Sequence, residues 1–308
     1  MRAQDAALQD SLPQAVIQTN RAGSRSPIPH VNLSAEQIAR IYTAQDIPYL
    51  LGATPSVVET SDAGAGVGYT GMRIRGADPT RVNVTINGVP LNDAESQGVF
   101  WVNLPDLASS ASEIQVQRGV GSSTNGAGAF GATVNIDLSR VNPETYAAVE
   151  NAVGSFNTRR HSLQTGTGLI GGRWAFSGRL STIQSDGYID RARSDLRSWH
   201  ASGAYIGERH SIQAHILSGA EKTYQAWYGV PAQYADDPAL RTFNPAGAER
   251  PGTPYDNEVD DYFQRHHLLH YRLLCTPSLT LQLNGHYTRG YGFFEQYKAA
   301  QAFADYGL

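Results

Sequence analysis

The histidines of residues 265–270, Arg-His-His-Leu-Leu-His, are the first whose type and spacing could do chemistry, because imidazole nitrogens bind zinc. His266 and His270 share one face of the chain. In a strand, however, they lie over about 13 Å apart at roughly 3.4 Å per residue, too far to share one zinc ion. His267 points to the opposite side. We therefore interpret all three as polar positions of a strand and predict no metal site.

A second motif, Gly126 to Gly131, matches the G-x-G-x-x-G pattern of dinucleotide-binding enzymes. That motif needs a helix directly after it, so that the pyrophosphate meets the helix N-terminus. Residues 133–136 instead have the character of a strand, and no Lys-Ser/Thr pair follows as in a P-loop. No nucleophile, base and orienting group converge elsewhere. We predict neither catalysis nor a cofactor, and a β-rich nucleotide-binding enzyme is kept as an alternative.

Acidic residues cluster near the end of a long segment, where their oxygens could hold calcium: Asp256, Glu258, Asp260 and Asp261. Their spacing is not that of an EF-hand. We interpret the cluster as a solvated acidic loop.

Composition narrows the class of protein. Only 17% of the 308 residues are charged and the formal net charge is -4, so nothing indicates a nucleic-acid partner. The single cysteine, Cys275, cannot form an internal disulfide. The mean hydropathy of -0.36 and the lack of a long apolar run exclude a transmembrane helix. Barrel strands are still possible, because only alternate residues of such strands are apolar.

The first part of the chain predicts an arm followed by two short helices. Residues 5–30 are polar and contain three prolines, which favours a flexible arm. Ser34 is placed to cap a short helix with Ile38 and Ile41 on one face. A second helical piece is expected over residues 47–51.

Short strands follow. Val82, Val84 and Ile86 alternate with polar residues, and Asn87-Gly88 comes directly after them. This dipeptide favours a two-residue type I′ turn, because both central residues need positive φ. Residues 114–116 and 134–136 predict two more strands.

Beyond Pro143, apolar and polar residues alternate with the period of antiparallel strands. The clearest windows are residues 174–181, 211–216 and 279–287. Tight links alternate with longer ones, of which residues 221–261 form the longest, and this asymmetry is typical of outer-membrane barrels. We expect about seven strands. Seven strands without closure would leave edge amides and carbonyls unpaired in lipid, so we expect a fragment of a larger barrel.

The stretch from Gly71 to Ile136 resembles the plug domain of TonB-dependent outer-membrane receptors through four motifs in the family's order. Residues 72–76 (MRIRG), 86–91 (INGVPL), 114–119 (IQVQRG) and 126–136 (GAGAFGATVNI) resemble the family's "IRG", "DGVPL", "IEVLRGP" and "YGSGAIGGVINI". The departures are Asn87 for Asp, Val120 for Pro, Asn125 for Tyr and Ala132 for Gly.

This resemblance implies an α+β plug domain followed by the first antiparallel strands of an incomplete transmembrane β-barrel. We assign the arm to residues 1–30, the plug to 31–140 and the barrel part to 141–308. The implied function is TonB-dependent active import of a scarce ligand, of the iron-siderophore, cobalamin or glycan class, across the outer membrane. TonB, that small molecule and outer-membrane lipid would be the partners. The alternative is an exported structural or adhesive β protein without transport.

The resemblance also suggests roles for single residues. Ala15, Val16, Ile17, Gln18 and Thr19 stand where the family carries its TonB box, an extended segment that can add to a partner's sheet edge. Arg75 and Arg118 match plug arginines that pair with carboxylates of the inner barrel wall. Independently of the resemblance, the longest link opens with three aromatic residues, Tyr224, Trp227 and Tyr228, which are either an interfacial girdle or the first ligand contacts. We favour the girdle for Tyr224 and ligand contact for Trp227. The first residues carry no apolar signal segment, so we expect the signal peptide to lie upstream of Met1.

Overall fold

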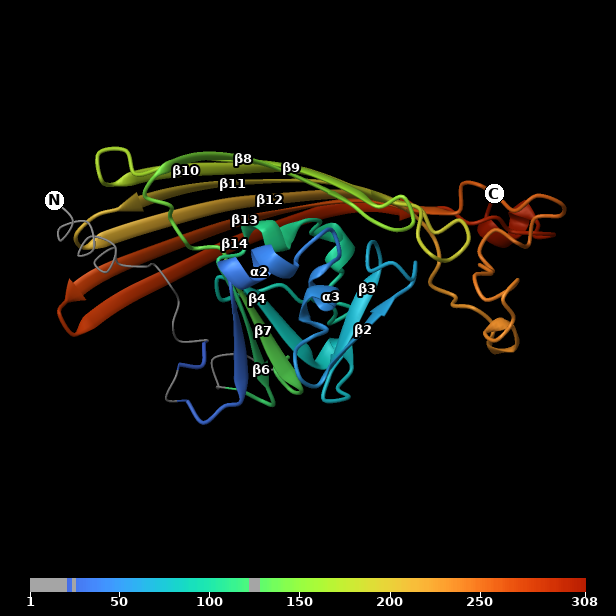
Figure 1. The fold of residues 1–308 in the computed structure, drawn as a ribbon, viewed down its shortest axis with the longest axis horizontal. Helices are drawn as coiled ribbons and strands as arrows, with labels where there is room; N and C mark the ends of the chain where they lie inside the picture. Colours follow the sequence, from blue (N-terminus) through green and yellow to red (C-terminus); the bar gives the residue numbers. More distant parts are fainter. Residues whose placement is uncertain (1–20, 24–25, 122–127) are drawn as a thin grey trace.

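The computed structural model describes residues 21–23, 26–121 and 128–308. An N-terminal domain lies against the concave face of a long, seven-stranded sheet, which arches over it (Figure 1). The two parts differ in how they bury side chains. The N-terminal domain has an apolar core, whereas the long sheet presents mainly polar residues to the domain.

The N-terminal domain is built on a five-stranded sheet of order β1-β6-β7-β4-β5. Its strands are β1 (His30–Ser34), β4 (Val82–Ile86), β5 (Val89–Pro90), β6 (Glu113–Arg118) and β7 (Ala132–Asp137). Among the described strands, only β4 and β7 pair in parallel. A separate hairpin consists of β2 (Val57–Ser61) and β3 (Thr70–Ile74).

The predicted turn between β4 and β5 is confirmed. Asn87 and Gly88 both have positive φ, 48° and 78°, which is the geometry a type I′ turn requires. The Asn87 amide donates to the carbonyl of Ile136 at 2.9 Å, which ties the turn to the end of β7. The Asn87 side chain is therefore held at the end of the small sheet.

Two short helices pack on this sheet as predicted. Helix α2 (Ala35–Ile41) begins with a capping box, in which the Ser34 hydroxyl accepts from the Gln37 amide and the Gln37 side chain accepts from the Ser34 amide. Helix α3 (Ile47–Leu51) follows. The remaining helical pieces are 3₁₀ turns: η2 (Pro79–Arg81), η3 (Trp101–Asn103), η4 (Leu107–Ser110), η6 (Ala232–Tyr234) and η7 (Phe303–Tyr306). Among the described residues, no helix has the length and apolar character to cross a membrane.

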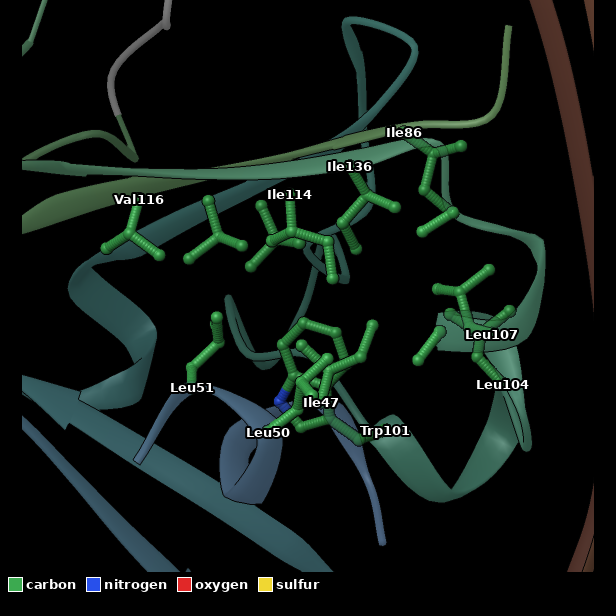
Figure 2. Close-up of a cluster of buried hydrophobic side chains, with 14 of the residues drawn as sticks. Ile47, Leu50, Leu51, Ile86, Trp101, Leu104, Leu107, Ile114, Val116 and Ile136 are labelled. Atoms are coloured by element: carbon green, nitrogen blue, oxygen red, sulfur yellow. The ribbon is translucent and has the colours of Figure 1, made fainter. Parts of the chain in front are cut away.

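The domain's core lies between the sheet and these helical pieces (Figure 2). Ile114 and Ile136 from the sheet face Leu51 from α3 and Trp101 from η3, and all four are at most 4% exposed. Burying side chains of this size contributes about 1.5–3 kcal/mol each. The core thus gives the N-terminal domain an apolar centre made mostly of its own residues, to which the long sheet adds Leu217 and Leu268.

The long sheet is a continuous antiparallel meander, in which each strand pairs with its neighbours in sequence. Its strands are β8 (Thr145–Val153), β9 (Arg159–Thr167), β10 (Trp174–Ser185), β11 (Ser194–Ile206), β12 (His210–Tyr224), β13 (Val259–Thr276) and β14 (Leu279–Phe294). The count of seven strands confirms the prediction. Among the described residues β8 and β14 are edge strands, each with one neighbour, so the sheet is not closed.

The two faces of the long sheet have opposite polarity. The convex face exposes large apolar side chains: Val149, Leu163, Trp174, Phe176, Leu180, Leu269, Leu283 and Tyr287. The concave face buries mainly polar ones: Arg160, Ser162, Arg179, Ser181, Ser198, His200, Gln213, His215 and Glu221. The large apolar side chains buried among them are Ile183, Leu196, Leu217 and Leu268. A soluble sandwich would place its apolar face inside. This arrangement, apolar outside and polar inside, is that of a membrane barrel wall.

Candidate functional site

Asp106 of the N-terminal domain is buried between two arginines of the long sheet. Its side chain has 0% exposure and receives Arg160 Nε at 2.8 Å and Arg179 Nη1 at 2.9 Å. Within its own domain it also accepts from Tyr42 Oη at 2.8 Å and Ser109 Oγ at 2.6 Å. Burial would raise the pKa of the Asp106 carboxyl, but the guanidinium groups of Arg179 and Arg160 outweigh it and hold the pKa below its usual range. Asp106 is therefore an ionised carboxylate.

The backbone places Asp106 in this position. It follows the 3₁₀ turn η3 and adopts a left-handed conformation with φ 58°, which Asp tolerates better than most residues. Arg160 and Arg179 come from β9 and β10, on the face where polar residues alternate inward. Arg160 also contacts Glu150 of β8 at 2.8 Å, and its guanidinium lies 4.9 Å from the ring centre of Tyr42. The result is a charge network that crosses from the domain to three neighbouring strands.

The main chain around Asp106 also touches the long sheet directly. The hydroxyl of Ser198 donates to the carbonyl of Pro105 at 2.7 Å, and Arg179 donates to the carbonyl of Asp106. On β12, a Cβ added to Gly219 would overlap the carbonyl oxygen of Asn103. The absent side chain of this glycine lets the loop 103–106 lie against the sheet.

A third contact joins the Asn87-Gly88 turn to the sheet. Asn87 Nδ2 lies 3.2 Å from His215 Nε2, and His215 Nδ1 lies 3.2 Å from His200 Nε2. Nearby, the Gln213 side chain donates to the carbonyl of Ser139 at 2.8 Å. The N-terminal domain is thus attached through charge pairs and hydrogen bonds, with apolar contacts from Ile183, Leu196, Leu217 and Leu268 of the wall.

A cavity of about 920 Å³ lies at the other end of the interface, next to the long loop between β12 and β13. Tyr69 of the N-terminal domain meets Trp227 of that loop edge to face, with ring centres 5.8 Å apart. The Tyr69 hydroxyl donates to Asp260 and is 3.5 Å from Glu221. The carboxylates of Asp62 and Asp93 also line the cavity.

Comparison with known proteins bears on this arrangement. Residues 23–133 match the family model described as the TonB-dependent Receptor Plug Domain. The described part of that stretch is a TonB-dependent receptor plug domain. No curated protein matches the sequence.

Solved structures extend the likeness to the long sheet. FpvA of P. aeruginosa, in a complex with pyoverdine and iron, is 13% identical with a TM-score of 0.66, and the match covers 85% of this chain and 34% of FpvA. The ferric yersiniabactin uptake receptor FyuA from Yersinia pestis is 13% identical with a TM-score of 0.65, and the match covers 88% of this chain and 42% of FyuA. The ferric citrate transporter FecA is 18% identical with a TM-score of 0.65, and the match covers 91% of this chain and 42% of FecA. At these identities the likeness concerns the fold, and the chain spans roughly a third to two fifths of the structures it matches. The predicted fold, a plug followed by antiparallel barrel strands, is confirmed.

The plug arginines singled out in the sequence lie away from the contacts above. Arg75 is exposed, with φ 53°, and its Nη1 approaches Gly119. Arg118 is half-buried; its amide donates to the carbonyl of Pro29 at 2.9 Å, and its Nε has no hydrogen-bond partner. Within the described ranges neither arginine takes part in an ion pair. Their pairing with wall carboxylates stays a prediction, and the charges seen here have the opposite arrangement, a plug carboxylate between wall arginines.

The predicted aromatic residues lie at the loop end of the barrel wall. The hydroxyl of Tyr224 donates to the carbonyl of Tyr255, and Arg191 lies over the Tyr224 ring at 5.8 Å. Trp227 lines the cavity, and Tyr228 receives a hydrogen bond from Gln296 at 2.8 Å. Tyr224 therefore supports the fold of the long loop, whereas Trp227 is open to the cavity. The candidate TonB box, residues 15–19, lies outside the described residues.

The motifs set aside in the sequence can also be located. Strand β7 follows the glycine-rich motif, whose first residues are outside the described ranges, where a dinucleotide site would need a helix. His266 and His270 both face the concave side and bond to Thr288 and Asn284 of β14. Within the described ranges, no group of three or more His, Cys, Asp or Glu side chains is arranged to hold a metal ion.

The sequence analysis did not identify Asp106, Arg160, Arg179, His200 or His215. Alternation places the four wall residues on the polar face of their strands. It could have marked them as inward-facing, but not which plug residue each would meet.

Proposed function

We propose that this chain is the N-terminal part of a receptor that imports a scarce ligand across the outer membrane in a TonB-dependent manner. The observation that carries the proposal is the chemistry of the plug–wall contact. The plug is attached through the Asp106 network and polar hydrogen bonds, and only a few wall side chains, such as Leu217 and Leu268, add apolar contact to its core. Because most of the plug's buried apolar residues pack within the plug, a domain held in this way can be shifted with little apolar surface exposed to water.

The proposed ligand site is the cavity beside Trp227. It lies between the plug and the loop end of the wall, so a bound molecule would touch both parts. Tyr69 and Trp227 offer aromatic surface, and Asp260 with Glu221 offers acceptor oxygens. We propose a ligand of the iron-siderophore, cobalamin or glycan class, and the similarity to FpvA, FyuA and FecA makes the ferric chelates the first to test. Import would change conformation only, with no covalent step.

The proposed energy coupling runs through residues 15–19. This segment would add as an extended strand to TonB, whose pull would displace the plug. The test is deletion of residues 15–19 in the intact receptor, with deletion of residues 5–9 in the same arm as the matched control. We expect the first deletion to abolish energy-dependent uptake of a radio-iron chelate and to leave binding at the cell surface unchanged, and the second to affect neither.

Ligand binding is tested separately at the cavity. Trp227→Ala should weaken binding of the chelate at the cell surface, whereas Leu240→Ala on the same loop should not; both side chains are 37% exposed, but only Trp227 lines the cavity. If none of the three ligand classes binds, and both deletions are silent, the alternative of a structural or adhesive surface protein is favoured instead.

A further inference from the structure

The contact between Asn87 and His215 has a defined hydrogen-bond direction. The Leu138 amide donates to Asn87 Oδ1 at 2.7 Å, so the oxygen of this side chain faces Leu138. The NH₂ group of Asn87 must then face His215 Nε2, 3.2 Å away. Because an amide nitrogen can only donate, His215 Nε2 has to accept and carries no proton.

The direction of this hydrogen bond also determines the direction of the next one, between His215 and His200. A neutral His215 with a bare Nε2 carries its proton on Nδ1, which lies 3.2 Å from His200 Nε2. His200 Nε2 must therefore accept as well. The two hydrogen bonds form together only when both imidazoles are neutral. A proton on His215 Nε2 would face the Asn87 amide hydrogens, and one on His200 Nε2 would face the hydrogen on His215 Nδ1.

The surroundings offer little compensation for a positive charge on either imidazole. His200 and His215 are 7% and 3% exposed. The positive charge of Arg179, on β10, would repel a positive charge on His200. His270 of β13 lies edge-on to His215, with ring centres 6.0 Å apart.

On the plug side, two further charged groups face this contact. Asp137, at the end of β7, would attract a positive charge on His215, but its carboxylate is already paired with Arg21 at 2.9 Å. Arg140 and His200 line a second cavity between plug and wall, and Arg140 pairs with Glu36 at 3.3 Å. Protonation of either imidazole would therefore place an uncompensated charge in a buried polar contact, which is costly.

We propose that Asn87, His215 and His200 form a proton-sensitive latch that holds the plug against the barrel wall at neutral pH and releases it on acidification. A free imidazole takes up a proton near a pKa of about 6.5. Below that pH the released plug binds protons that the latched plug cannot, so the latched state loses stability as the pH falls. Each ring that gains a proton on release raises the released fraction by up to about tenfold per pH unit.

The test measures the distance between plug and wall in isolated outer membranes containing the intact receptor. Spin labels are attached at Glu95→Cys, in an exposed loop of the plug, and Ser278→Cys, in an exposed turn of the wall, with the native thiol removed by Cys275→Ser. Double electron–electron resonance then gives the fraction of plugs at a longer distance. We expect this fraction to rise at least tenfold from about pH 8 to about pH 5, the range in which imidazole titrates.

Three variants separate the latch from a general effect of acid. Asn87→Asp replaces the donor with an acceptor, which a protonated His215 can bond, so acidification should no longer release the plug. The double variant His200→Gln/His215→Gln can keep the hydrogen-bond direction without titrating, so its released fraction should not vary with pH. His266→Gln removes an imidazole of the same wall that bonds only to Thr288 and Gln264 in the described structure, and it should behave like the parent. A parent distance that does not vary with pH, or an Asn87→Asp variant that releases as the parent does, would overturn the proposal.

Discussion

Asp106 of the plug and Arg160 of the barrel wall form an ion pair with side-chain exposures of 0% and 4%, and 2.8 Å separates the carboxylate oxygen from Nε. They are 54 residues apart in sequence and belong to different parts of the fold. Because Arg179 completes the network from the next strand, two buried positive charges of the wall meet at this one plug carboxylate.

Asp106→Asn should therefore destabilise the plug where it is attached to the wall. Removing one partner of a buried ion pair leaves the other uncompensated, which costs about 3–5 kcal/mol. The expected result is a loss of that size in the free energy of plug unfolding in urea. The matched control is Asp78→Asn, whose partner Arg73 lies 3.5 Å away with both side chains about half exposed, and here a loss of no more than about 1 kcal/mol is expected. Equal losses in the two variants would contradict a structural role for the buried network.

Gly219→Ala should push the plug off the wall by a steric route. The new Cβ would overlap the Asn103 carbonyl and come within 2.9 Å of Pro105 Cδ. Forcing extra atoms into a packed contact costs about 1–3 kcal/mol. Gly285→Ala, also in a strand but with nothing within 4 Å of the added Cβ, is the control and should be nearly neutral. Unfolding curves in which both variants match the parent would show that the loop 103–106 does not depend on this close approach.

The sequence predicted the local elements of this fold because their causes are local. Ser34 and Gln37 cap α2 from three residues apart, and Asn87-Gly88 accepts the positive φ that its turn needs. Alternation likewise marked the polar face of the wall strands. Nothing in the sequence indicated that Asp106 would meet Arg160, because that contact depends on where a loop with left-handed φ meets a sheet folded from a distant part of the chain. For the same reason Asn87 was assigned its turn but not its contact with His215.

The convex face predicts how the wall responds to charge. Leu180, 59% exposed at the middle of β10, should face lipid acyl chains. Leu180→Arg is expected to cost about 2–4 kcal/mol, the usual cost of arginine near the bilayer midplane on a barrel's outer face. The measurement is the urea midpoint of the intact receptor folded into phospholipid vesicles. Ser278→Arg, in a tight turn at the strand ends, should leave that midpoint unchanged; a silent Leu180→Arg would mean that this face meets water.

Asp46 gives the plug a pH dependence of the opposite sign to the latch. It is 6% exposed, accepts from Thr70 Oγ1 at 2.8 Å, and has no cationic partner in the described residues. Burial outweighs this hydrogen bond and raises the pKa of the Asp46 carboxyl to about 7. The folded plug therefore keeps a proton that the unfolded chain releases near pH 4, on a reference pKa of about 3.9. Stability present at low pH is lost as the pH rises from there through the folded pKa of about 7.

Asp46→Asn should remove this slope, so the variant's gain in unfolding free energy over the parent should be larger at high pH than at low pH. Asp93→Asn provides the contrast. The amide of Ser96 donates to the Asp93 carboxylate at 2.7 Å and lowers its pKa, so its contribution is present above the unfolded pKa and lost as the pH falls. Urea titrations of the two variants across this range should then diverge from the parent in opposite directions. Parallel curves for Asp46→Asn and the parent would mean that water or a cation reaches the Asp46 carboxylate in the folded plug.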